Sequence, residues 1–317
     1  AGMLPFSGIF YLFFFFFYVF FAMSGFIMYY VHRHEFGNYK NAPAFAKKRF
    51  IRIYPVYWIY LLMCGTGLLV QNRVSLVDFL NNASLLILPN RIIIPPSWIL
   101  WIEVIFYIFF TIVIINKRFG FAVIVLWLAT VFTVQILSLD INYLVFNPFN
   151  LCFVFGLITA YAGINLKPTV LKRIVPFLWS SGALLFCLII VYSFLNNHHD
   201  PGNLAQFFEL PWILSCGVMS MMLLFAAFSK KIEAFSEKRK ILIALGNGSF
   251  SIFLLHFPLG RLVLSGVENI DAIWSSQNIW VHNLVMVVVS IVITGICYLA
   301  YLYIEKPVVN YLRKKVV

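Results

Sequence analysis

The sequence predicts an all-α protein that crosses a membrane many times. Of its 317 residues, 62% are hydrophobic and only 11% are charged, and the mean hydropathy is +0.93. A soluble domain is typically about 45–50% apolar, so this chain lies outside that class. Its apolar residues also fall into segments of about the length that a helix needs to cross a bilayer. We therefore expect a polytopic transmembrane helical bundle, with residues 1–317 forming a single integral domain.

Nine apolar segments are predicted to be membrane spans. In chain order they are 8–31, 54–71, 98–115, 120–138, 148–165, 174–195, 211–228, 241–262 and 280–303. Each is close to the ~20 residues that a helix needs to cross ~30 Å of hydrocarbon. A shorter apolar patch at Leu85–Leu88 is followed by Pro89, Pro95 and Pro96. Because proline interrupts helices, we expect this patch to be an interfacial or re-entrant piece.

The basic residues are distributed unevenly between alternate connections. Twenty Lys and Arg residues lie in 32–53, 116–119, 166–173, 229–240 and 304–317, and only three lie in the opposite set. Short loops rich in Lys and Arg stay in the cytoplasm, so the net charge of +12 indicates membrane topology and no nucleic-acid partner. We expect a cytoplasmic C-terminus in an inner or plasma membrane. The odd number of spans places the N-terminus outside, unless a preceding span is missing.

A basic stretch leads into the second predicted span. Lys47, Lys48, Arg49 and Arg52 lie within six residues of one another. In a helix, Arg49 and Arg52 share a face, so their guanidinium groups can hold one polyanionic group together. The alternative is simple anchoring at the membrane surface, which Lys47 and Lys48 fit fully. Pro55 suits the first turn of a helix, which predicts that the span begins near it.

Two ionisable residues lie inside predicted spans, where a lone charge costs roughly 2.5–3.5 kcal/mol. Glu103 is about 8 Å below the outer end of its helix, with Tyr107 one turn deeper on the same face. His256 is about 9 Å from the outer end of a helix that runs the other way. A carboxylate and an imidazole at one level can share a proton and act as general acid or base toward an alcohol. The alternatives are a neutral carboxyl or one paired with Arg261, and a histidine bonded to a backbone carbonyl.

Other polar and small residues give weaker signals. Ser24 and Gly25 lie in an otherwise bulky helix and are expected to allow close helix packing, with substrate binding by Ser24 as the alternative. The five cysteines show no CxxC or Cys/His spacing, so neither a disulfide framework nor a zinc site is indicated. His198, His199 and Asp200 lack further ligands, and no metal site is predicted.

Several separated stretches resemble the acyltransferase 3 family of integral membrane O-acyltransferases, which modify surface polysaccharides and lipid-linked sugars. The first is similar to the family's Phe-Phe-x-x-Ser-Gly-Phe signature, and the second contains an Arg-x-x-Arg pair. In chain order the stretches are Phe20–Phe26, Arg49–Trp58, Ser97–Tyr107, Gly246–Pro258 and Glu305–Pro307. Each is a weak match alone, but their order and spacing cover nearly the whole chain.

The resemblance implies a function for these residues. Arg49 and Arg52 are expected to bind an acyl-CoA donor from the cytoplasm, as a co-substrate with no permanently bound cofactor. The acyl group, expected to be acetyl, passes to a sugar hydroxyl of a surface polysaccharide or lipid-linked glycan. Glu103 and His256 are the catalytic candidates. Trp98, Tyr107 and Ser24 are the substrate-binding candidates.

The resemblance also implies ten helices, one more than the sequence supplies. Family members carry a helix before the Ser-Gly-Phe helix, with a histidine widely taken as catalytic, and we expect that helix to precede Ala1. The arginines are expected to lie roughly 20 Å from the level of Glu103 and His256, given ~30 Å of hydrocarbon. The pantetheine arm or a relayed intermediate has to cover that distance.

Two other functions remain open from the sequence. A transporter or flippase of a lipid-linked sugar would use Glu103 and His256 as a proton relay. No inverted repeat is evident, which disfavours this alternative. A non-catalytic scaffold is the third possibility. Binding of coenzyme A separates the enzyme from the transporter.

Overall fold

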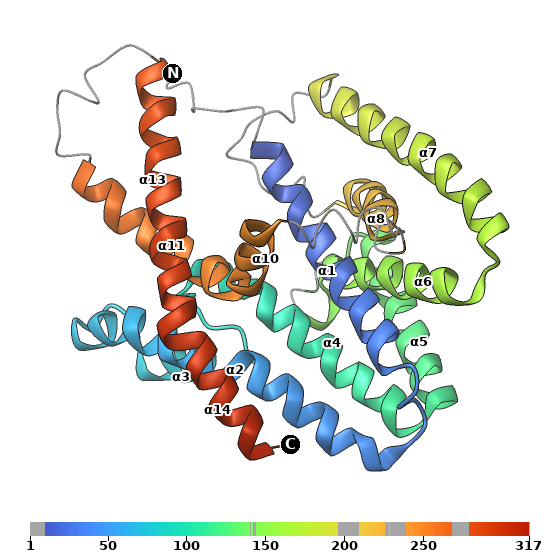
Figure 1. Ribbon diagram of the computed structural model, residues 1–317, viewed down its shortest axis with the longest axis horizontal. Coiled ribbons are helices and arrows are strands. Elements are labelled where there is room, and N and C mark those ends of the chain that lie inside the picture. Colours follow the sequence, from blue (N-terminus) through green and yellow to red (C-terminus); the bar gives the residue numbers. More distant parts are fainter. Residues whose placement is uncertain are drawn as a thin grey trace. The chain divides into compact units, whose positions relative to one another are not determined.

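The computed structural model describes residues 10–139, 141, 144–195, 209–225, 228, 239–267 and 279–316, and no strand occurs among them (Figure 1). The chain forms two compact units. The first unit contains Pro43–Val104 and Ser236–Val317, and the second contains Ser7–Ala42 and Ile105–Phe235. The prediction of an all-α chain is confirmed for the described residues.

Six helical segments among the described residues are long and apolar enough to cross a membrane. They are Phe15–His32, Tyr39–Val70, Pro95–Ile115, Lys117–Ile136, Pro148–Asn165 and Leu284–Lys315. A seventh is possible if the bent pair Lys240–Asn247 and Ser249–Val263 is one span. The predicted count of nine is therefore not confirmed, although multiple spans are. Two further predicted segments lie on helices α7 (Pro168–Leu195) and α8 (Leu210–Phe225).

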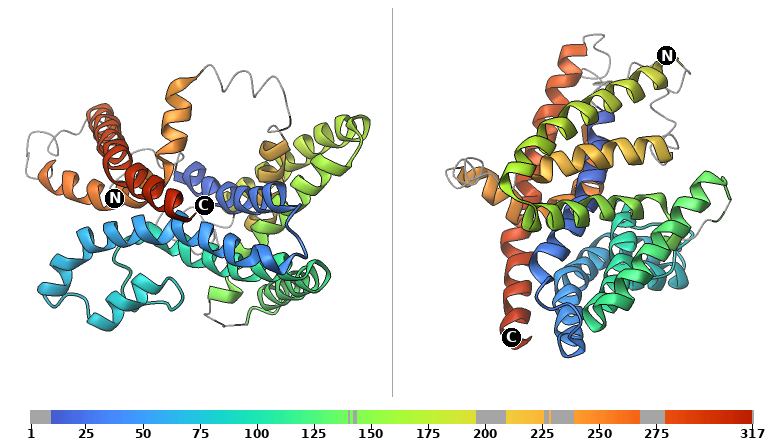
Figure 2. Two further views of the ribbon diagram at one scale, coloured as in Figure 1. Left: turned by 60° about the horizontal axis from the view of Figure 1, so that its bottom comes forward. Right: turned by 90° about the vertical axis from the view of Figure 1, so that its right-hand side faces the viewer.

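The second unit is built around helix α1. Its remaining elements are α5 (Lys117–Ile136), η3 (Leu144–Phe146), η4 (Pro148–Leu151), α6 (Cys152–Asn165), α7 and α8, together with the later part of α4 (Trp98–Ile115). Helix α1 (Phe10–His32) packs along α6 and α8, as both views in Figure 2 show. Ala22 and Phe26 form a buried cluster with Ala160 of α6 and Leu224 of α8.

Glycines bring the backbones of α1 and α6 close together. A Cβ atom at Gly25 would meet the carbonyl oxygen of Phe153, and one at Gly156 would meet the carbonyl oxygen of Ala22. Side chains of any other residue would push these helices apart, because the clashing atoms belong to the backbone and cannot rotate away. The sequence prediction that small residues allow close helix approach is therefore confirmed at Gly25.

Replacing Gly156 with alanine is expected to destabilise the protein by about 1–3 kcal/mol, the typical cost of overpacking. The added methyl group would collide with the backbone of α1 at Ala22. Thermal unfolding in detergent micelles measures the loss. Gly67→Ala is the matched control, because a Cβ at Gly67 meets nothing within 4 Å. Equal melting temperatures for the two variants would contradict the close packing of α1 and α6.

The first unit begins with a helix that starts earlier than expected. Helix α2 runs over Ala42–Val70, so Pro55 lies in its interior and not in its first turn. The basic stretch is therefore helical, and the prediction that a helix begins near Pro55 is wrong. Proline removes one backbone hydrogen bond, here the bond to Ile51, and thirteen preceding residues of uninterrupted helix maintain the segment around it.

Aromatic side chains of α2 bind the end of a short helix, α3 (Leu76–Ser84). Tyr57 Oη donates to the carbonyl oxygen of Asn82 at 3.0 Å, and Trp58 Nε1 donates to that of Ala83 at 2.8 Å. Tyr54 Oη donates to the next carbonyl, that of Ser84, at 2.9 Å. These carbonyls have no partner within α3, because no N–H group of the helix follows its last turn to donate to them. The aromatic run that follows the basic stretch therefore fixes α3 against α2.

The remaining helices of the first unit come from the C-terminal part of the chain. They are α10 (Lys240–Asn247), α11 (Ser249–Val267), α13 (Ile279–Ala300), the π-helical turn η7 (Tyr301–Glu305) and α14 (Lys306–Val316). Helix α11 packs against α13, against η7 and against the short turn η2 (Pro95–Ser97). Figure 2 shows α13, η7 and α14 as one long rod.

The predicted span 241–262 is broken into two helices. Helices α10 and α11 meet at Gly248 with a bend of 70°. Asn247 and Gly248 are weak helix formers, so an interruption there costs little. A Cβ at Gly248 would lie 3.0 Å from the ring of Tyr298. The break therefore places the first turn of α11 against the C-terminal rod.

Candidate functional site

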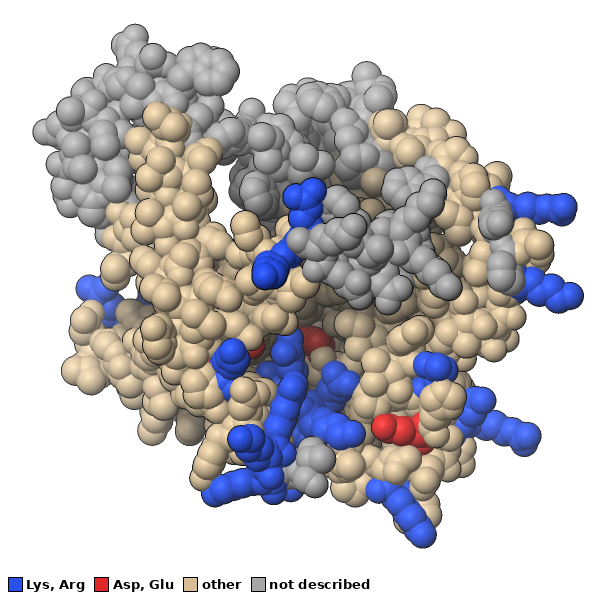
Figure 3. All heavy atoms as spheres, viewed as in Figure 1, with Lys and Arg blue, Asp and Glu red and all other residues tan. Residues whose placement is uncertain are grey.

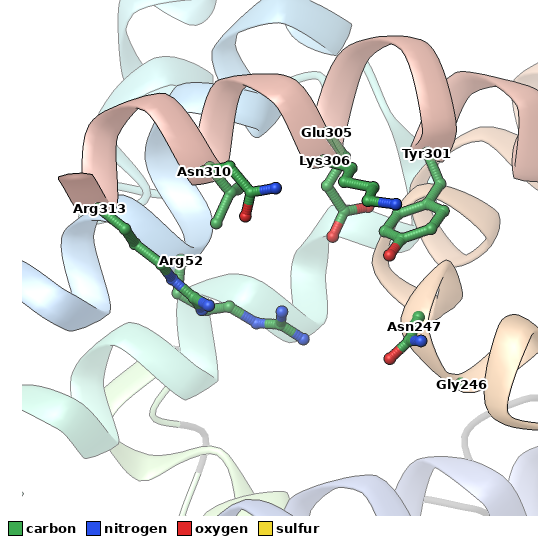
Figure 4. A pocket seen from close by; sticks show the side chains of 9 residues that line it. Arg52, Gly246, Asn247, Tyr301, Glu305, Lys306, Asn310 and Arg313 are labelled. Carbon is green, nitrogen blue, oxygen red and sulfur yellow. The ribbon is translucent and has the colours of Figure 1, made fainter.

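The first unit contains a polar pocket of about 200 Å³. Its walls come from α2, from the end of α10, and from η7 and α14 (Figure 4). The lining residues are Arg52, Gly246, Asn247, Tyr301, Glu305, Lys306, Val309, Asn310 and Arg313. Figure 4 shows the Arg52 side chain extending into the space that Glu305, Tyr301 and Asn247 face. The pocket thus joins the basic stretch of the sequence to the C-terminal tail.

The pocket carries a positive charge. Arg52, Lys306 and Arg313 face one carboxylate, Glu305, which leaves a net charge of +2. Among the described residues none of the three cations makes a hydrogen bond, and no ion pair joins Arg52 to Glu305, although the two interact electrostatically. Figure 3 shows Lys and Arg side chains gathered over the region of α2 and α14. The three cationic groups are therefore available to a ligand.

Glu305 is fixed by the first turn of α11. Its Oε2 accepts hydrogen bonds from the Ser251 hydroxyl at 2.5 Å and from the Ser251 backbone N–H at 3.2 Å. The Ser251 hydroxyl also lies 2.7 Å from the hydroxyl of Tyr60 on α2. Because the first N–H groups of a helix lack internal partners, the carboxylate caps α11 from a neighbouring helix. One buried network therefore connects α2, α11 and the C-terminal rod.

Pro307 explains why Glu305 points into this network. Proline has no N–H, so the ordinary helical bond to the carbonyl of Tyr303 is missing at Pro307. The turn immediately before it is widened to the π form over Tyr301–Glu305. Such single π turns inside α-helices occur frequently at functional sites. Glu305 is only 3% exposed as a result of its place in this turn.

The two arginines predicted to bind the donor occupy different surroundings. Arg52 is exposed and lines the pocket, whereas Arg49 is half-buried and is not among the lining residues. The Arg49 guanidinium lies 5.4 Å from the ring centroid of Phe45, one turn earlier on the same helix. The structure therefore brings Arg52 together with Lys306 and Arg313, and it does not bring Arg49 into the pocket.

The predicted acceptor-side residues are mostly buried. On α4, Glu103 is 7% exposed and Tyr107, one helical turn later, is 8% exposed. Trp98 is half-buried at the first position of the same helix. Ser24 is 7% exposed on α1, in the second unit. Glu103 and Tyr107 thus share a buried face of α4, as the sequence predicts.

His256 differs from Glu103 in its exposure. It lies on α11 with an exposed ring, and its Nδ1 lies 3.1 Å from the carbonyl oxygen of Ile252 and 2.8 Å from that of Phe253. A carbonyl oxygen only accepts, so Nδ1 carries the proton and Nε2 is the free acceptor of the neutral ring. No hydrogen bond between described residues joins His256 to Glu103. The imidazole therefore has one nitrogen suited to accept a proton from outside its own helix.

Sequence reasoning missed most of the pocket. Glu305 lies two residues beyond the predicted span 280–303, so the sequence does not place its charge inside a span. Lys306 and Arg313 were interpreted only as topology signals in a basic tail. The available signal was the Glu-Lys-Pro stretch of the family resemblance, Glu305–Pro307. Its spacing from Arg52 in the chain gives no indication that the two meet.

No metal-binding arrangement is present in the part of the chain that the structure describes. Groups of three or more His, Cys, Asp or Glu side chains suited to a metal ion do not occur there. The sequence His198, His199 and Asp200 lies outside the described residues.

Comparison with known proteins gives one informative match. The sequence model of an acyltransferase domain family matches residues 2–302, which is nearly the whole chain. No curated protein and no solved structure matches. The predicted resemblance is therefore confirmed by an independent comparison, and the multiple apolar helices fit an integral membrane protein. This chain belongs to the acyltransferase 3 family of membrane acyltransferases.

Proposed function

We propose that the protein transfers an acyl group, which we take to be acetyl, from cytoplasmic acyl-CoA to a hydroxyl of a surface polysaccharide or lipid-linked glycan. Arg52 binds the donor phosphates in the pocket, Arg49 contacts the donor from outside it, and His256 and Glu103 serve the chemistry. The observation that carries the donor assignment is the position of Arg52 in a polar pocket with a net charge of +2. Guanidinium groups suit phosphate because their planar donors match its oxygens in pairs.

The proposed transfer is a nucleophilic acyl substitution. His256 Nε2 takes the proton of the acceptor hydroxyl while the oxygen attacks the thioester carbonyl. The carbon–sulfur bond breaks, and the coenzyme A thiolate leaves and recovers the proton. Glu103 stabilises the positive charge that forms on the imidazole or orients the acceptor. Trp98, Tyr107 and Ser24 contribute to the acceptor side.

The proposed donor site and the proposed base are connected by α11. Ser251, which contacts Glu305 at the pocket, and His256 are five residues apart on one helix, or about 7.5 Å along its axis. This separation supports a direct transfer in which the pantetheine arm extends along α11. With so short a separation, the acyl group needs no relayed intermediate.

The proposed topology follows from the charge distribution. Arg52 of α2 and Arg313 of α14 line the same pocket, which supports placing the basic stretch and the C-terminus on one side of the membrane. We assign that side to the cytoplasm, because Lys-rich and Arg-rich connections remain there. Nine spans in a single integral domain of the inner or plasma membrane remain our proposal for residues 1–317.

Replacing Arg52 with alanine is expected to raise the KM for acyl-CoA by about tenfold to a hundredfold, since a hydrogen bond to a charged group contributes about 1.5–3 kcal/mol. The measurement is transfer of radiolabelled acetyl groups from acetyl-CoA in membranes. Lys47→Ala is the matched control, because Lys47 lies on the same helix, is exposed and does not line the pocket. Equal KM values for wild type and Arg52→Ala would reject the donor assignment of Arg52.

The break between α10 and α11 is a feature that the transporter alternative also explains. Interrupted helices line the substrate sites of many transporters, but there they occur as pairs in matching halves. A transporter of a lipid-linked sugar predicts flux across sealed vesicles without acyl-CoA. If vesicles that contain the protein form no labelled acetylated product but still transport the lipid-linked sugar, the transporter is favoured over the enzyme.

A further inference from the structure

We infer that Lys306 and Arg313 of the C-terminal helix bind the phosphate groups of the donor together with Arg52. Glu305 acts as the residue that positions this helix. The inference deepens the proposed function and rests on it for the identity of the ligand. It adds a second wall to the donor site, from a segment more than 250 residues away in the chain.

The charge of the pocket defines the class of ligand. Three cations from α2 and α14 converge on one cavity with a single carboxylate among its lining residues. The net charge of +2 matches a group that carries two negative charges, which is the state of a phosphate monoester or of a diphosphate esterified at both ends near neutral pH. Arg52 and Arg313 supply planar donor pairs, and Lys306 supplies a compact point charge.

The size of the pocket limits which part of the donor it holds. Pockets for complete drug-sized ligands measure about 300–1,000 Å³, and this one measures about 200 Å³. It therefore fits the phosphate groups and excludes the whole of a coenzyme A molecule. Asn247 and Asn310 add neutral amide groups to the lining, which suit phosphate oxygens not paired with a cation.

Glu305 is compatible with a phosphate site because its carboxylate already accepts two hydrogen bonds from Ser251. Both hydrogen bonds from Ser251 end on Oε2, and this contact ties the π turn to the first turn of α11. Lys306 follows Glu305 directly, so the same two hydrogen bonds also fix the backbone position of Lys306. Removing the hydrogen bonds between Glu305 and Ser251 is expected to loosen α14, which forms one wall of the pocket, without removing a cation.

Two kinds of ligand carry phosphate groups that suit this pocket, namely acyl-CoA and the headgroup of an anionic lipid. Both carry phosphate at the membrane surface, where the basic ends of α2 and α14 are expected. The experiment therefore needs one arm for each source. Lys306 and Arg313 are exposed and make no hydrogen bond to a described residue, so glutamine at either position is expected to leave the fold intact.

The test is calorimetric titration of the 317-residue chain in detergent micelles with acetyl-CoA. Wild type, Lys306→Gln, Arg313→Gln and the control Lys314→Gln are compared at low and high salt. Lys314 lies on the same helix and is exposed, but it does not line the pocket. We expect about a tenfold loss of affinity for each pocket variant and none for the control. Salt should weaken wild type more than the pocket variants, which carry less charge.

The second arm repeats the comparison in nanodiscs with and without phosphatidic acid. We expect the pocket variants to retain as much phosphatidic acid as wild type. Unchanged acetyl-CoA affinity in both pocket variants would overturn the inference while leaving the proposed function standing if wild type binds. No acetyl-CoA binding by wild type would overturn both. Loss of phosphatidic acid with unchanged acetyl-CoA affinity would assign the pocket to a lipid and reject the donor role.

Discussion

Replacing His256 with alanine is expected to lower the rate of acyl transfer by about 10²–10⁴-fold, the usual contribution of a general base. The Nδ1 position is occupied by backbone carbonyls at 2.8 and 3.1 Å, which fixes the tautomer and leaves Nε2 to accept a proton. Affinity for acetyl-CoA should be unchanged, because His256 is not among the residues that line the pocket. Glu103→Gln should also lower kcat and leave donor affinity intact.

The measurement for both variants is the initial rate of acetyl transfer at saturating acetyl-CoA, with donor affinity measured separately. His34→Ala is the control, since His34 is exposed on a connection and has no proposed role. Full activity of His256→Ala would remove this residue from the mechanism.

Replacing Glu305 with alanine is expected to lower stability by about 1.5–3 kcal/mol or more, and to weaken donor binding because the α14 wall of the pocket loosens by more than the gain in positive charge offsets. The substitution deletes the acceptor of two hydrogen bonds and leaves the Ser251 N–H and hydroxyl to find new partners in a buried site. A hydrogen bond to a charged group contributes about 1.5–3 kcal/mol, and an unsatisfied buried group adds a penalty. Tyr60 can compensate in part, because its hydroxyl already contacts Ser251.

Glu305→Gln separates the charge from the hydrogen bonds. The amide oxygen can still accept from Ser251, so most of the stability should return. The pocket then gains positive charge, and donor affinity should equal or exceed that of wild type. Thermal unfolding and acetyl-CoA titration distinguish the two variants. If Glu305→Ala melts and binds like wild type, the cap on α11 has no structural or functional role.

Much of this fold was predictable because hydrophobic segments of about 20 residues have few alternatives to a membrane helix. The start of α2 was not predictable, because Pro55 locally indicates the first turn of a helix and the residues before it give a weaker signal. The break at Gly248 was missed for the opposite reason. Apolar residues continue on both sides of it, so composition alone shows one span.

The site was predictable only in part. Arg52 was selected by its spacing from Arg49, but spacing on one helix gives no information about what lies opposite. Lys306 and Arg313 reach the pocket through the packing of η7 and α14 with the rest of the first unit. The π turn that places Glu305 depends on how Pro307 is accommodated in a long helix, which the local sequence does not determine.

The central claim is that this chain is an acyl-CoA-dependent acyltransferase whose donor phosphates bind in the pocket of Arg52. The most direct measurement is calorimetric titration of acetyl-CoA into the purified wild-type chain and into Arg52→Gln, at two salt concentrations. The account predicts saturable, salt-sensitive binding to wild type that weakens at least about tenfold in the variant. Absence of binding to wild type, or equal affinity in both proteins, would contradict it.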